Sequence, residues 1–395
     1  MEINEILICG GGNATHTLIP ILRKKFSGKI NLFLPIQSEL KQFNHLITSS
    51  GKISVTFGSE TFSGSINNAS NLPEEVCNNA DLILLPIPAF IHEPILKKII
   101  PFVKLNSIIG AIPARGGFEF SSLNILKVNK REDIKIFGMQ TLPWACRIRK
   151  YASRVDILGI KDSVGLATYP HKSVFEITKT LTNLLSIDIE PLPNLLTLTL
   201  ANIGQIVHPG IMYGLFKGRE NMRYKKEEIP LFYQGVNREI AEILNEMSKE
   251  IQRIVSVITS RYKKIDLSHV LPLKDWLIKS YPNDIVDKST IMSCFTTNRA
   301  YNGLQAPMKI SNGYYIPNFN SRYLTEDIPF GLLVTYSIAY LAGVEVPIIK
   351  RVIKKTSKWM NKEYLVNSQL IGKDIQSTRI PQNYFLNSIN EIVKF

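Results

Sequence analysis

The stretch Ile6-Leu7-Ile8-Cys9-Gly10-Gly11-Gly12-Asn13-Ala14-Thr15 decides the fold of the first part of this chain. An apolar strand runs into three glycines, and a helix is predicted from Asn13 to about Lys24, although Pro20 should interrupt it. A strand, a glycine turn and a helix in this order are typical of a dinucleotide-binding site. Gly10 permits the tight turn, and Gly12 lets the backbone approach a pyrophosphate, which the N–H groups at Asn13 and Ala14 would stabilise. A plain glycine turn is the alternative, because Thr15 occupies the third glycine position.

Strands and helices alternate after this turn. Strands are predicted at residues 29–34, 81–85 and 107–112, with a helix at 92–103 and a hairpin or short edge strands at 52–57 and 60–66. This alternation predicts an α/β fold with a parallel, doubly wound, Rossmann-like sheet. Two more strands, at 134–138 and 155–161, should extend that sheet.

A chain of 395 residues is too long for one ordinary core and suggests two domains. Pro191 and Pro193 mark the change, so we expect a dinucleotide-binding domain at 1–188 and an all-helical domain at 189–395. Apolar residues at 3- and 4-residue steps between 236 and 258 predict one face of a long helix. The apolar stretch at 330–349 contains polar residues and is interpreted as a buried helix, so no membrane association is expected.

Composition bounds the possible partners. The net charge of +14 comes from scattered basic residues, which indicates a solvated surface rather than a nucleic-acid site. A basic cleft would also attract anionic keto acids and dinucleotides. The four cysteines show no metal-binding spacing, so no metal site is expected and a reduced, cytoplasmic protein is the simple interpretation. No signal peptide is visible at the N-terminus.

The choice between NAD and NADP stays open at this point. The second strand ends in Leu34-Pro35-Ile36-Gln37-Ser38, which contains no acid for the ribose hydroxyls. No arginine stands there for a 2′-phosphate either, and Lys41 is the nearest cation.

A second candidate cofactor segment follows the strand at 81–85. Pro86 and Pro88 lie at the carboxyl end of this strand, where such folds bind ligands, and His92 follows closely. We predict that Pro86, Pro88 and His92 contact the cofactor, with a helix-start role for His92 as the alternative.

Three clusters far apart in the sequence carry the candidate chemistry: Leu142-Pro143-Trp144-Ala145-Cys146-Arg147, His208-Pro209-Gly210 and the segment from Ser321 to Asp327. Pro209 should kink its helix so that it presents the imidazole of His208, which suits a general acid/base near neutral pH. Cys146 is interpreted as an adjacent thiol and not as a nucleophile.

Asp327 and Arg322 are the charged candidates of the third cluster. Asp327 would orient His208 and stabilise its protonated form, and it could equally cap the helix that follows. Arg322 would bind an anion, either the cofactor pyrophosphate or a substrate carboxylate, unless it is a plain surface residue.

Together these clusters resemble the opine dehydrogenases, from Ile6 to about Pro347. The resemblance implies an NAD- or NADP-dependent oxidoreductase that acts on CH–NH groups and joins a 2-keto acid to the amino group of an amino acid. It implies a Rossmann domain, a helical domain and an active site in the cleft between them. It also makes Gln140, Thr141, Trp276 and Asn202 the substrate-binding candidates and places Pro86 to His92 beside the nicotinamide ribose.

The amine substrate is the open question within this resemblance. Octopine dehydrogenases, which use arginine, carry Glu where Gln140 stands, and a neutral amide complements a guanidinium less well than a carboxylate. We therefore expect an amino acid without a strongly cationic side chain as the amine. The resemblance implies a small keto acid, most often pyruvate in this family. A monomer or homodimer without a nucleic-acid partner is expected.

Three other functions remain open from the sequence. An opine-type metallophore synthase would use a larger, polyamine-like amine. A ketopantoate- or glycerol-3-phosphate-type reductase should have Lys where His208 stands. A dinucleotide-binding regulator without turnover would leave His208, Asp327 and Arg322 without a role.

Overall fold

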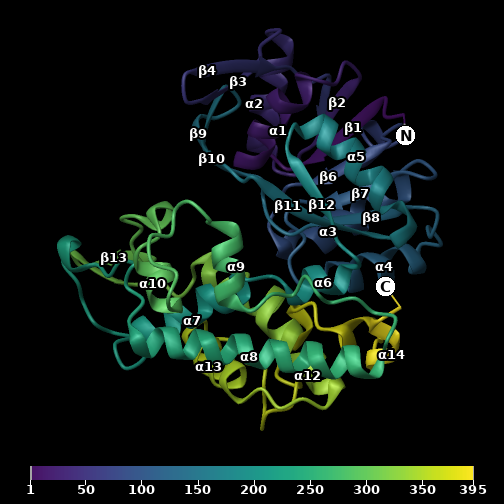
Figure 1. The fold of residues 1–395 in the computed structure, drawn as a ribbon. Coiled ribbons are helices and arrows are strands. Elements are labelled where there is room, and N and C mark those ends of the chain that lie inside the picture. The colour runs from purple at the N-terminus through teal and green to yellow at the C-terminus, as the bar shows by residue number, and fades with distance from the viewer. Residues whose placement is uncertain (1, 395) are drawn as a thin grey trace. The chain divides into compact units, whose positions relative to one another are not determined.

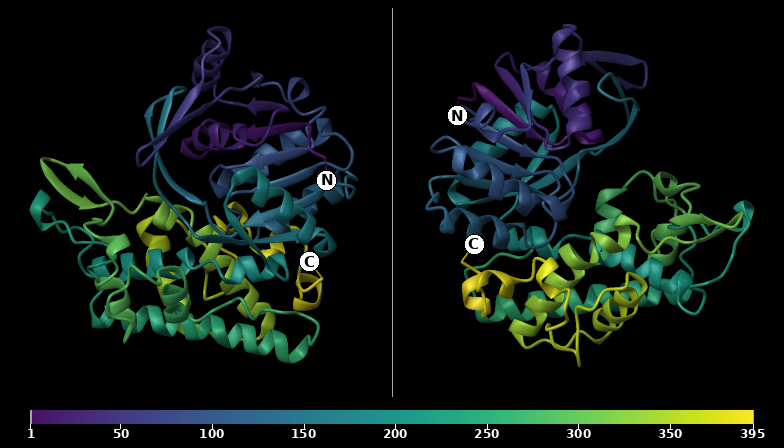
Figure 2. Two further views of the ribbon diagram at one scale, coloured as in Figure 1. Left: turned by 45° about the horizontal axis from the view of Figure 1, so that its top comes forward. Right: turned by 180° about the vertical axis from the view of Figure 1, so that it is seen from behind.

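The computed structural model describes residues 2–394. The chain divides into two compact units, the first ending at Leu198 and the second covering Thr199–Lys394. In Figures 1 and 2 the first unit runs from purple to teal and the second from teal to yellow.

The first unit is built on an eight-stranded sheet with the order β12-β11-β8-β7-β6-β1-β2-β5. Adjacent strands are parallel except β8 and β11. The strands are β1 (Glu5–Cys9), β2 (Lys29–Phe33), β5 (Asn68–Ser70), β6 (Leu82–Leu85), β7 (Ile108–Ala111), β8 (Lys135–Met139), β11 (Ser163–Tyr169) and β12 (Asp188–Pro191). The predicted Rossmann-like, doubly wound sheet is confirmed.

Helices cover both faces of this sheet. Ile6 and Ile8 of β1 pack in one core with α1 (Asn13–Arg23), α2 (Gln37–Thr48) and α5 (Val174–Leu185). Leu7 and Cys9 pack on the other side with α3 (Ala89–Ile99) and α4 (Phe118–Val128). Because successive side chains of a strand point to opposite faces, a strand buried on both sides is apolar throughout, as β1 is.

A second sheet in this unit corrects one prediction. The strand expected at 155–161 forms as β10 (Arg154–Ile160), but it does not extend the main sheet. It pairs with β9 (Trp144–Lys150) and β3 (Ile53–Phe57), which continues into β4 (Glu60–Gly64), in a four-stranded sheet. Spacing along a sequence shows that a strand exists but not which edge it joins, and here β3 offers the free edge.

One local prediction about a proline needs correction, because helix α1 continues through Pro20 instead of being interrupted there. Pro209 also lies inside a continuous helix, α7 (Gly204–Phe216), and the predicted kink at His208 stays a prediction. Close packing of α1 against β4 offsets the hydrogen bond that Pro20 removes. A Cβ built on Gly64 of β4 would lie 2.8 Å from the Pro20 Cα and from the Ile19 carbonyl oxygen. Proline removes one hydrogen bond, which a tightly packed helix tolerates.

The boundary between the units lies later than residue 188. Strand β12 (Asp188–Pro191) pairs with β11, and Leu192, Leu195 and Leu198 join the core of the first unit. Pro191 and Pro193 therefore mark the end of the last strand, and the compact unit ends at Leu198.

The second unit consists mainly of helices. They are α7 (Gly204–Phe216), α8 (Arg238–Arg261), α9 (Leu273–Ser280), α10 (Ile291–Thr296), α11 (Arg322–Thr325), α12 (Leu333–Ala342), α13 (Pro347–Trp359) and α14 (Ile389–Ile392), and α6 (Leu195–Leu200) leads into them. One short hairpin, β13 (Met308–Ser311) and β14 (Tyr314–Pro317), is added to the predicted helical pattern.

Helix α8 organises this unit. Asn237 caps it by accepting a hydrogen bond from the Ile240 N–H, and its predicted apolar face is buried. Helices α7, α12 and α13 pack against it. Each large apolar side chain buried in this way contributes about 1.5 to 3 kcal/mol to stability.

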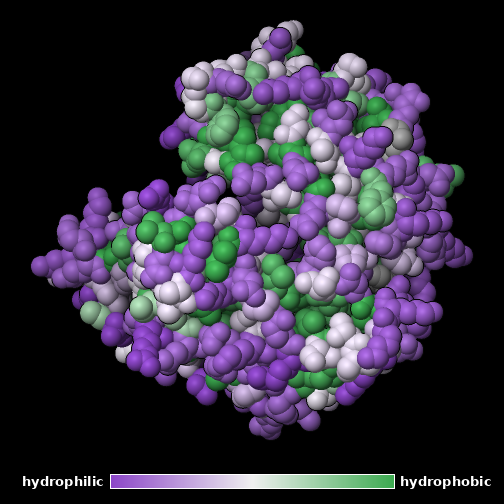
Figure 3. All heavy atoms as spheres, in the orientation of Figure 1, coloured by the Kyte–Doolittle hydropathy of each residue, from purple (hydrophilic) through white to green (hydrophobic). Residues whose placement is uncertain are grey.

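Apolar and polar surfaces fit a folded globular chain. The residues Leu195–Phe216 have the length and hydropathy of a membrane span, but 89% of the apolar window is buried inside the fold, as in a core helix. Figure 3 shows one face of the molecule, which is mainly hydrophilic with scattered apolar groups.

Candidate active site

The glycine turn after β1 leaves open space in front of the start of helix α1. Gly10 has φ of +95°, which strongly favours glycine, and a Cβ there would lie 2.5 Å from the Ile87 side chain. No atom lies within 4 Å of a Cβ built on Gly12, so open space lies in front of the helix start. Helix α1 has no acid in its first turn and no side-chain cap. The first-turn N–H groups, Asn13 and Ala14 included, thus fit a pyrophosphate.

His16 links this turn to the β9–β10 hairpin through two hydrogen bonds. Its Nδ1 lies 3.0 Å from the Gly12 carbonyl oxygen, and its Nε2 accepts from the Ala152 N–H at 2.8 Å. A carbonyl only accepts and an amide only donates, so a neutral ring with the proton on Nδ1 satisfies both. Burial lowers the pKa of His16, partly opposed by the Gly12 hydrogen bond, in agreement with a neutral ring.

The Asn13 side chain has a structural task in the same place. Its Oδ1 accepts from the Ile148 N–H of β9 at 2.7 Å, while the Thr15 hydroxyl donates to the Gly10 carbonyl. Asn13 and Ala14 are therefore available to a phosphate through their backbone amides, and contact with the cofactor stays a prediction.

The turn between β6 and α3 touches the glycine turn through Ile87 and Gly10. Pro86 ends the strand and Pro88 precedes α3. His92 is fully buried, and its Nε2 lies 3.0 Å from the Ile87 carbonyl oxygen while its ring packs edge-on against Phe118. His92 thus holds the turn in place, and any contact of this segment with the cofactor would involve the turn more than the imidazole.

Gln140 and Thr141 follow β8 at its carboxyl end. The Gln140 N–H donates to the Gly165 carbonyl, and a Cβ on Gly165 would lie 3.2 Å from the Gln140 side-chain oxygen. Both residues are half-buried and lie in the first unit with the glycine turn. Cys146 is nearby in β9, and burial raises the pKa of its thiol, which disfavours a thiolate nucleophile.

His208 and Asp327 meet in the second unit, 119 residues apart in sequence. The His208 Nδ1 and the Asp327 Oδ2 lie 2.7 Å apart, and the Asp327 side chain is only 2% exposed. The His208 Nε2 lies 3.0 Å from the Tyr233 hydroxyl. The predicted His–Asp contact therefore forms, with Nδ1–H donating to the carboxylate.

Tyr233 completes the hydrogen bonding of His208. Burial raises the pKa of Tyr233 well above its ordinary value, and the neighbouring Tyr323 and Asp327 raise it further. When the proton of the neutral His208 ring is on Nδ1, Nε2 is an acceptor, and the Tyr233 hydroxyl, which also contacts Tyr323, is the donor within reach of it.

Aromatic rings surround this pair. Tyr323 stacks on His208 with 4.1 Å between ring centroids, and Tyr233 stacks on Tyr301 at the same distance. Tyr281 packs edge-on against Tyr301, and Trp276 packs edge-on against Tyr281. Trp276 thus belongs to the same aromatic cluster as His208, although it is three rings away.

A π-helical turn explains how Asp327 reaches His208. Residues Ile328–Leu332 form this turn, in which the Leu332 N–H donates to the Asp327 carbonyl. A Cβ on Gly331 would lie 2.8 Å from the Gln205 side chain, so the turn packs closely on α7 one helical turn before His208. The Asp327 carboxylate makes no capping bond to this helix, and its Oδ2 contacts the His208 Nδ1. Turns of this kind are frequent at functional sites.

Buried amides lock the start of α7. Gln205 donates to the Thr199 and Leu200 carbonyls and accepts from the Thr335 hydroxyl at 2.6 Å. Asn202 is buried next to this network, with its amide 3.5 Å from a Cβ on Gly331. Asn202 therefore lies close to the support of Asp327.

Arg322 has an acidic partner directly after its own helix. Its Nε and Nη2 donate to the Glu326 Oε2 at 2.8 and 2.5 Å. The Arg322 side chain is 59% exposed, whereas the Glu326 side chain is 2% exposed. A buried carboxylate thus fixes one side of an otherwise accessible guanidinium.

Four residues that contact these sites were not predicted: Tyr233 and Tyr323, which contact His208, and Glu39 and Tyr151, which lie beside Gly11 of the glycine turn. Tyr323 lies inside a quoted cluster, between Arg322 and Asp327, and could have been considered. Nothing in the sequence around Tyr233 or Tyr151 signals a site, because the contact with His208 or with Gly11 arises only on folding.

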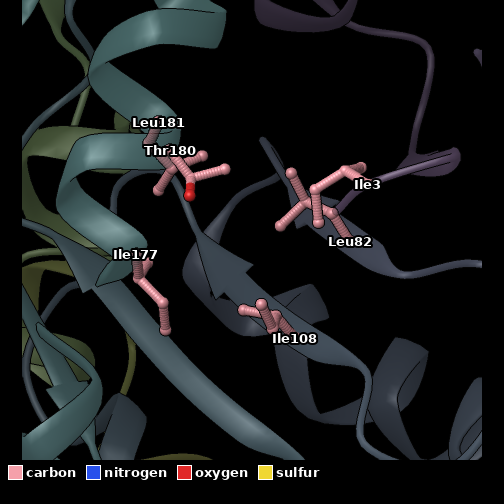
Figure 4. Close-up of a pocket in the computed structure, with 6 residues that line it drawn as sticks. All are labelled: Ile3, Leu82, Ile108, Ile177, Thr180 and Leu181. Carbon is pink, nitrogen blue, oxygen red and sulfur yellow. The ribbon is translucent and has the colours of Figure 1, made fainter. Parts of the chain in front are cut away.

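An apolar hollow in the first unit is not a cofactor site. Figure 4 shows its lining, which consists of Ile3, Leu82, Ile108, Ile177, Thr180 and Leu181. Leu82 and Ile108 begin their strands, so the hollow lies at the amino ends of the sheet, opposite the edge where such folds bind ligands. Within residues 2–394 no group of three or more His, Cys, Asp or Glu is arranged to hold a metal.

Comparisons with known proteins agree with this architecture. Residues 191–360 match the family model described as NAD/NADP octopine/nopaline dehydrogenase, alpha-helical domain. The chain is 33% identical to an opine dehydrogenase from Haliotis discus hannai over 98% of both chains. It superposes on a solved octopine dehydrogenase with NADH and L-arginine with a TM-score of 0.91 and 30% identity, covering 98% of this chain and 97% of that one. A structure of octopine dehydrogenase with NADH and pyruvate gives a TM-score of 0.88 and 28% identity, with the same coverage.

Proposed function

The chain belongs to the opine dehydrogenase family, and we propose that it joins a 2-keto acid to the amino group of an amino acid with NADH or NADPH as reductant. The hydrogen-bonded pair of His208 and Asp327 is the observation that carries this proposal. A plain dinucleotide-binding protein has no need of a buried acid that orients an imidazole.

The overall reaction needs both proton transfer and hydride transfer. The amine attacks the keto carbonyl, water leaves, and the resulting imine accepts a hydride at carbon and a proton at nitrogen. The reduced nicotinamide supplies the hydride when bound. His208 in its neutral form takes a proton at Nε2 from the substrate ammonium, which frees the amine to attack, and in its protonated form it returns a proton to the reacting oxygen or nitrogen.

Asp327 makes both states of His208 accessible. Its carboxylate fixes the proton of the neutral ring on Nδ1, which leaves Nε2 as the reacting nitrogen, and it stabilises the imidazolium. Tyr323 stacks on the ring and restricts its rotation. A substrate donor would take the place of the Tyr233 hydroxyl on Nε2.

The first unit supplies the cofactor site in this proposal. Gly10, Gly12, Asn13 and Ala14 would receive the pyrophosphate, because the turn is open above Gly12 and the helix start carries no acid. The Pro86–His92 turn would lie beside the nicotinamide ribose, and Arg322 would bind an anionic group of the cofactor.

Substrate selection falls to the other predicted residues. Gln140, Thr141, Asn202 and Trp276 would hold the amino acid, and pyruvate is the keto acid that we favour, as a relative has been solved with it. The neutral amide of Gln140 favours an amine substrate without a strongly cationic side chain.

A coupled assay tests the function. Oxidation of NADH and NADPH is followed with pyruvate plus a panel of neutral, acidic and basic amino acids, and the product is identified by mass as the secondary amine. Turnover that requires both pyruvate and an amine supports the proposal. Reduction of pyruvate without an amine would indicate a hydroxy-acid dehydrogenase instead, and preference for a polyamine-like amine would indicate a metallophore synthase.

We also propose a soluble, cytoplasmic enzyme. All four cysteines are free, and three of them are buried, which suits a reducing compartment. A monomer or a homodimer is proposed, and light scattering of the purified chain distinguishes the two.

A further inference from the structure

An acidic side chain that was not predicted from the sequence, Glu39, lies beside the glycine turn. In dinucleotide-binding folds an acid after the second strand accepts hydrogen bonds from the adenosine ribose, and arginine there accommodates a 2′-phosphate. Strand β2 ends at Phe33, and the residues that follow directly contain no acid. The first turn of α2 brings Glu39 back toward the turn instead.

The close approach to Gly11 shows where the Glu39 carboxylate lies. A Cβ built on Gly11 would lie 2.8 Å from the Glu39 Oε2 and 2.4 Å from the Tyr151 hydroxyl. Any larger residue at position 11 would displace one of these groups. Gly11 therefore allows a carboxylate and a phenol to approach the middle of the glycine turn.

Ring packing holds both groups in place. Tyr151 packs edge-on against His16 of α1 at 4.8 Å and against Phe43 of α2 at 5.7 Å. Phe43 is fully buried one helical turn after Glu39. Two helices and the β9–β10 turn thus define the position of the carboxylate, as a recognition group requires.

The electrostatics of Glu39 follow from this position. Burial raises the pKa of Glu39, and the adjacent Tyr151 hydroxyl and Gly11 amide partly oppose the rise. A half-buried carboxylate of this kind accepts hydrogen bonds from neutral hydroxyls and repels a second anion more strongly than an exposed one would.

We propose that Glu39 reads the adenosine ribose and selects NADH over NADPH. The carboxylate accepts hydrogen bonds from the ribose hydroxyls, whereas a 2′-phosphate in that place brings two negative charges against it. This inference rests on the proposed function only in requiring that a nicotinamide dinucleotide binds at Gly10 to Ala14.

Lys41 represents the opposite possibility. It lies two residues further along α2 and is exposed, and a 2′-phosphate bound there would favour NADPH. The two residues predict opposite preferences, so one set of titrations decides between them.

Binding titrations of the full chain test the proposal without turnover. Dissociation constants for NADH and NADPH are measured by calorimetry for the wild type, Glu39→Gln, Lys41→Ala and the exposed control Glu132→Gln. We expect NADPH to bind the wild type about 100-fold more weakly than NADH, which corresponds to about 2.7 kcal/mol. Glu39→Gln should reduce this ratio to about tenfold or less, mainly by strengthening NADPH binding, and both other variants should keep the wild-type ratio.

A second pair of probes separates ribose recognition from the rest of the cofactor. AMP and adenosine 2′,5′-bisphosphate should show the same order in the wild type and the same change in Glu39→Gln. A wild type that binds NADPH as tightly as NADH overturns the proposal even if the variant fails to fold. An unchanged ratio in a folded Glu39→Gln overturns it as well. Loss of turnover with keto acid and amine would contradict the proposed function but leave these binding ratios intact.

Discussion

Replacement of Asp327 by Asn removes one charge from the centre of the proposed acid/base pair and changes little else. The Asp327 side chain is 2% exposed and accepts the Nδ1–H of His208 at 2.7 Å. The amide of Asn has a similar shape and still offers an oxygen acceptor. The substitution therefore tests the charge and the tautomer of His208 rather than the packing.

The expected size of the effect follows from this one hydrogen bond. A hydrogen bond to a charged group contributes about 1.5 to 3 kcal/mol and a neutral one about 0.5 to 1.5 kcal/mol. Replacing one by the other costs about 1 to 1.5 kcal/mol, or roughly a tenfold loss of kcat. His208→Ala removes the acid/base group itself and should cost roughly a hundredfold or more.

A double-mutant cycle shows whether the two residues act together. The kcat for amine-dependent NADH oxidation is measured for Asp327→Asn, His208→Ala and the double variant, with the exposed His171→Ala as control. Because Asp327 acts through His208, the double variant should be no slower than His208→Ala alone. NADH affinity, measured by fluorescence titration, should stay unchanged in all four proteins.

Two outcomes would refute this reasoning. Near-wild-type turnover in His208→Ala would remove the imidazole from the mechanism. A further tenfold loss on adding Asp327→Asn to His208→Ala would show that the carboxylate acts on the substrate directly or only stabilises the fold.

Three further changes test other parts of the molecule. Arg322→Ala should weaken NADH binding about tenfold and abolish any NADH-dependent compaction in solution scattering, and unchanged compaction would assign Arg322 to the substrate or the surface. Gln140→Glu should raise kcat/KM for arginine relative to neutral amino acids by about tenfold, since a charge-assisted contact contributes about 1.5 to 3 kcal/mol; a wild type that already prefers arginine contradicts this. Burial lowers the folded-state pKa of His16, so the unfolded chain binds the proton more readily and stability is lost as pH falls below about 6.5. The Tm measured between pH 7 and 5 should therefore fall less in His16→Gln than in the wild type.

The strands of the main sheet and its parallel, doubly wound class were accessible from the sequence, but the edge that each later strand joins was not. A fully apolar run such as β1, followed by a glycine turn, has one common structural solution, because both faces of the strand are buried. The segment at 154–160 is equally strand-like, yet it pairs with β3, about a hundred residues earlier. Pairing at such a separation depends on which edge is free after folding, and local pattern carries no information on this.

The same distinction applies to the candidate site. His208 and Asp327 could be named because the clusters that contain them resemble the opine dehydrogenases; taken alone, the residues fit a core histidine and a helix cap as well. Tyr233 could not, since an aromatic residue in a loop is common and only the 3.0 Å contact with Nε2 gives it a role. Glu39 was not predicted for a related reason. It lies beyond the strand end where an acid is expected, and the first turn of α2 brings its carboxylate back to Gly11.

The side chains that contact His208 or hold its helix in place belong to the second unit. Asp327, Tyr233 and Tyr323 contact the imidazole directly, and Gln205 with Thr335 fixes the start of its helix. These contacts all form within the same unit, so the geometry of the His208–Asp327 pair needs no cofactor to form. In the proposed function, the acid/base group is therefore oriented before any cofactor or substrate binds. For this reason, changes at His208 should alter kcat without altering NADH affinity, whereas changes at the glycine turn or Arg322 should alter the affinity first.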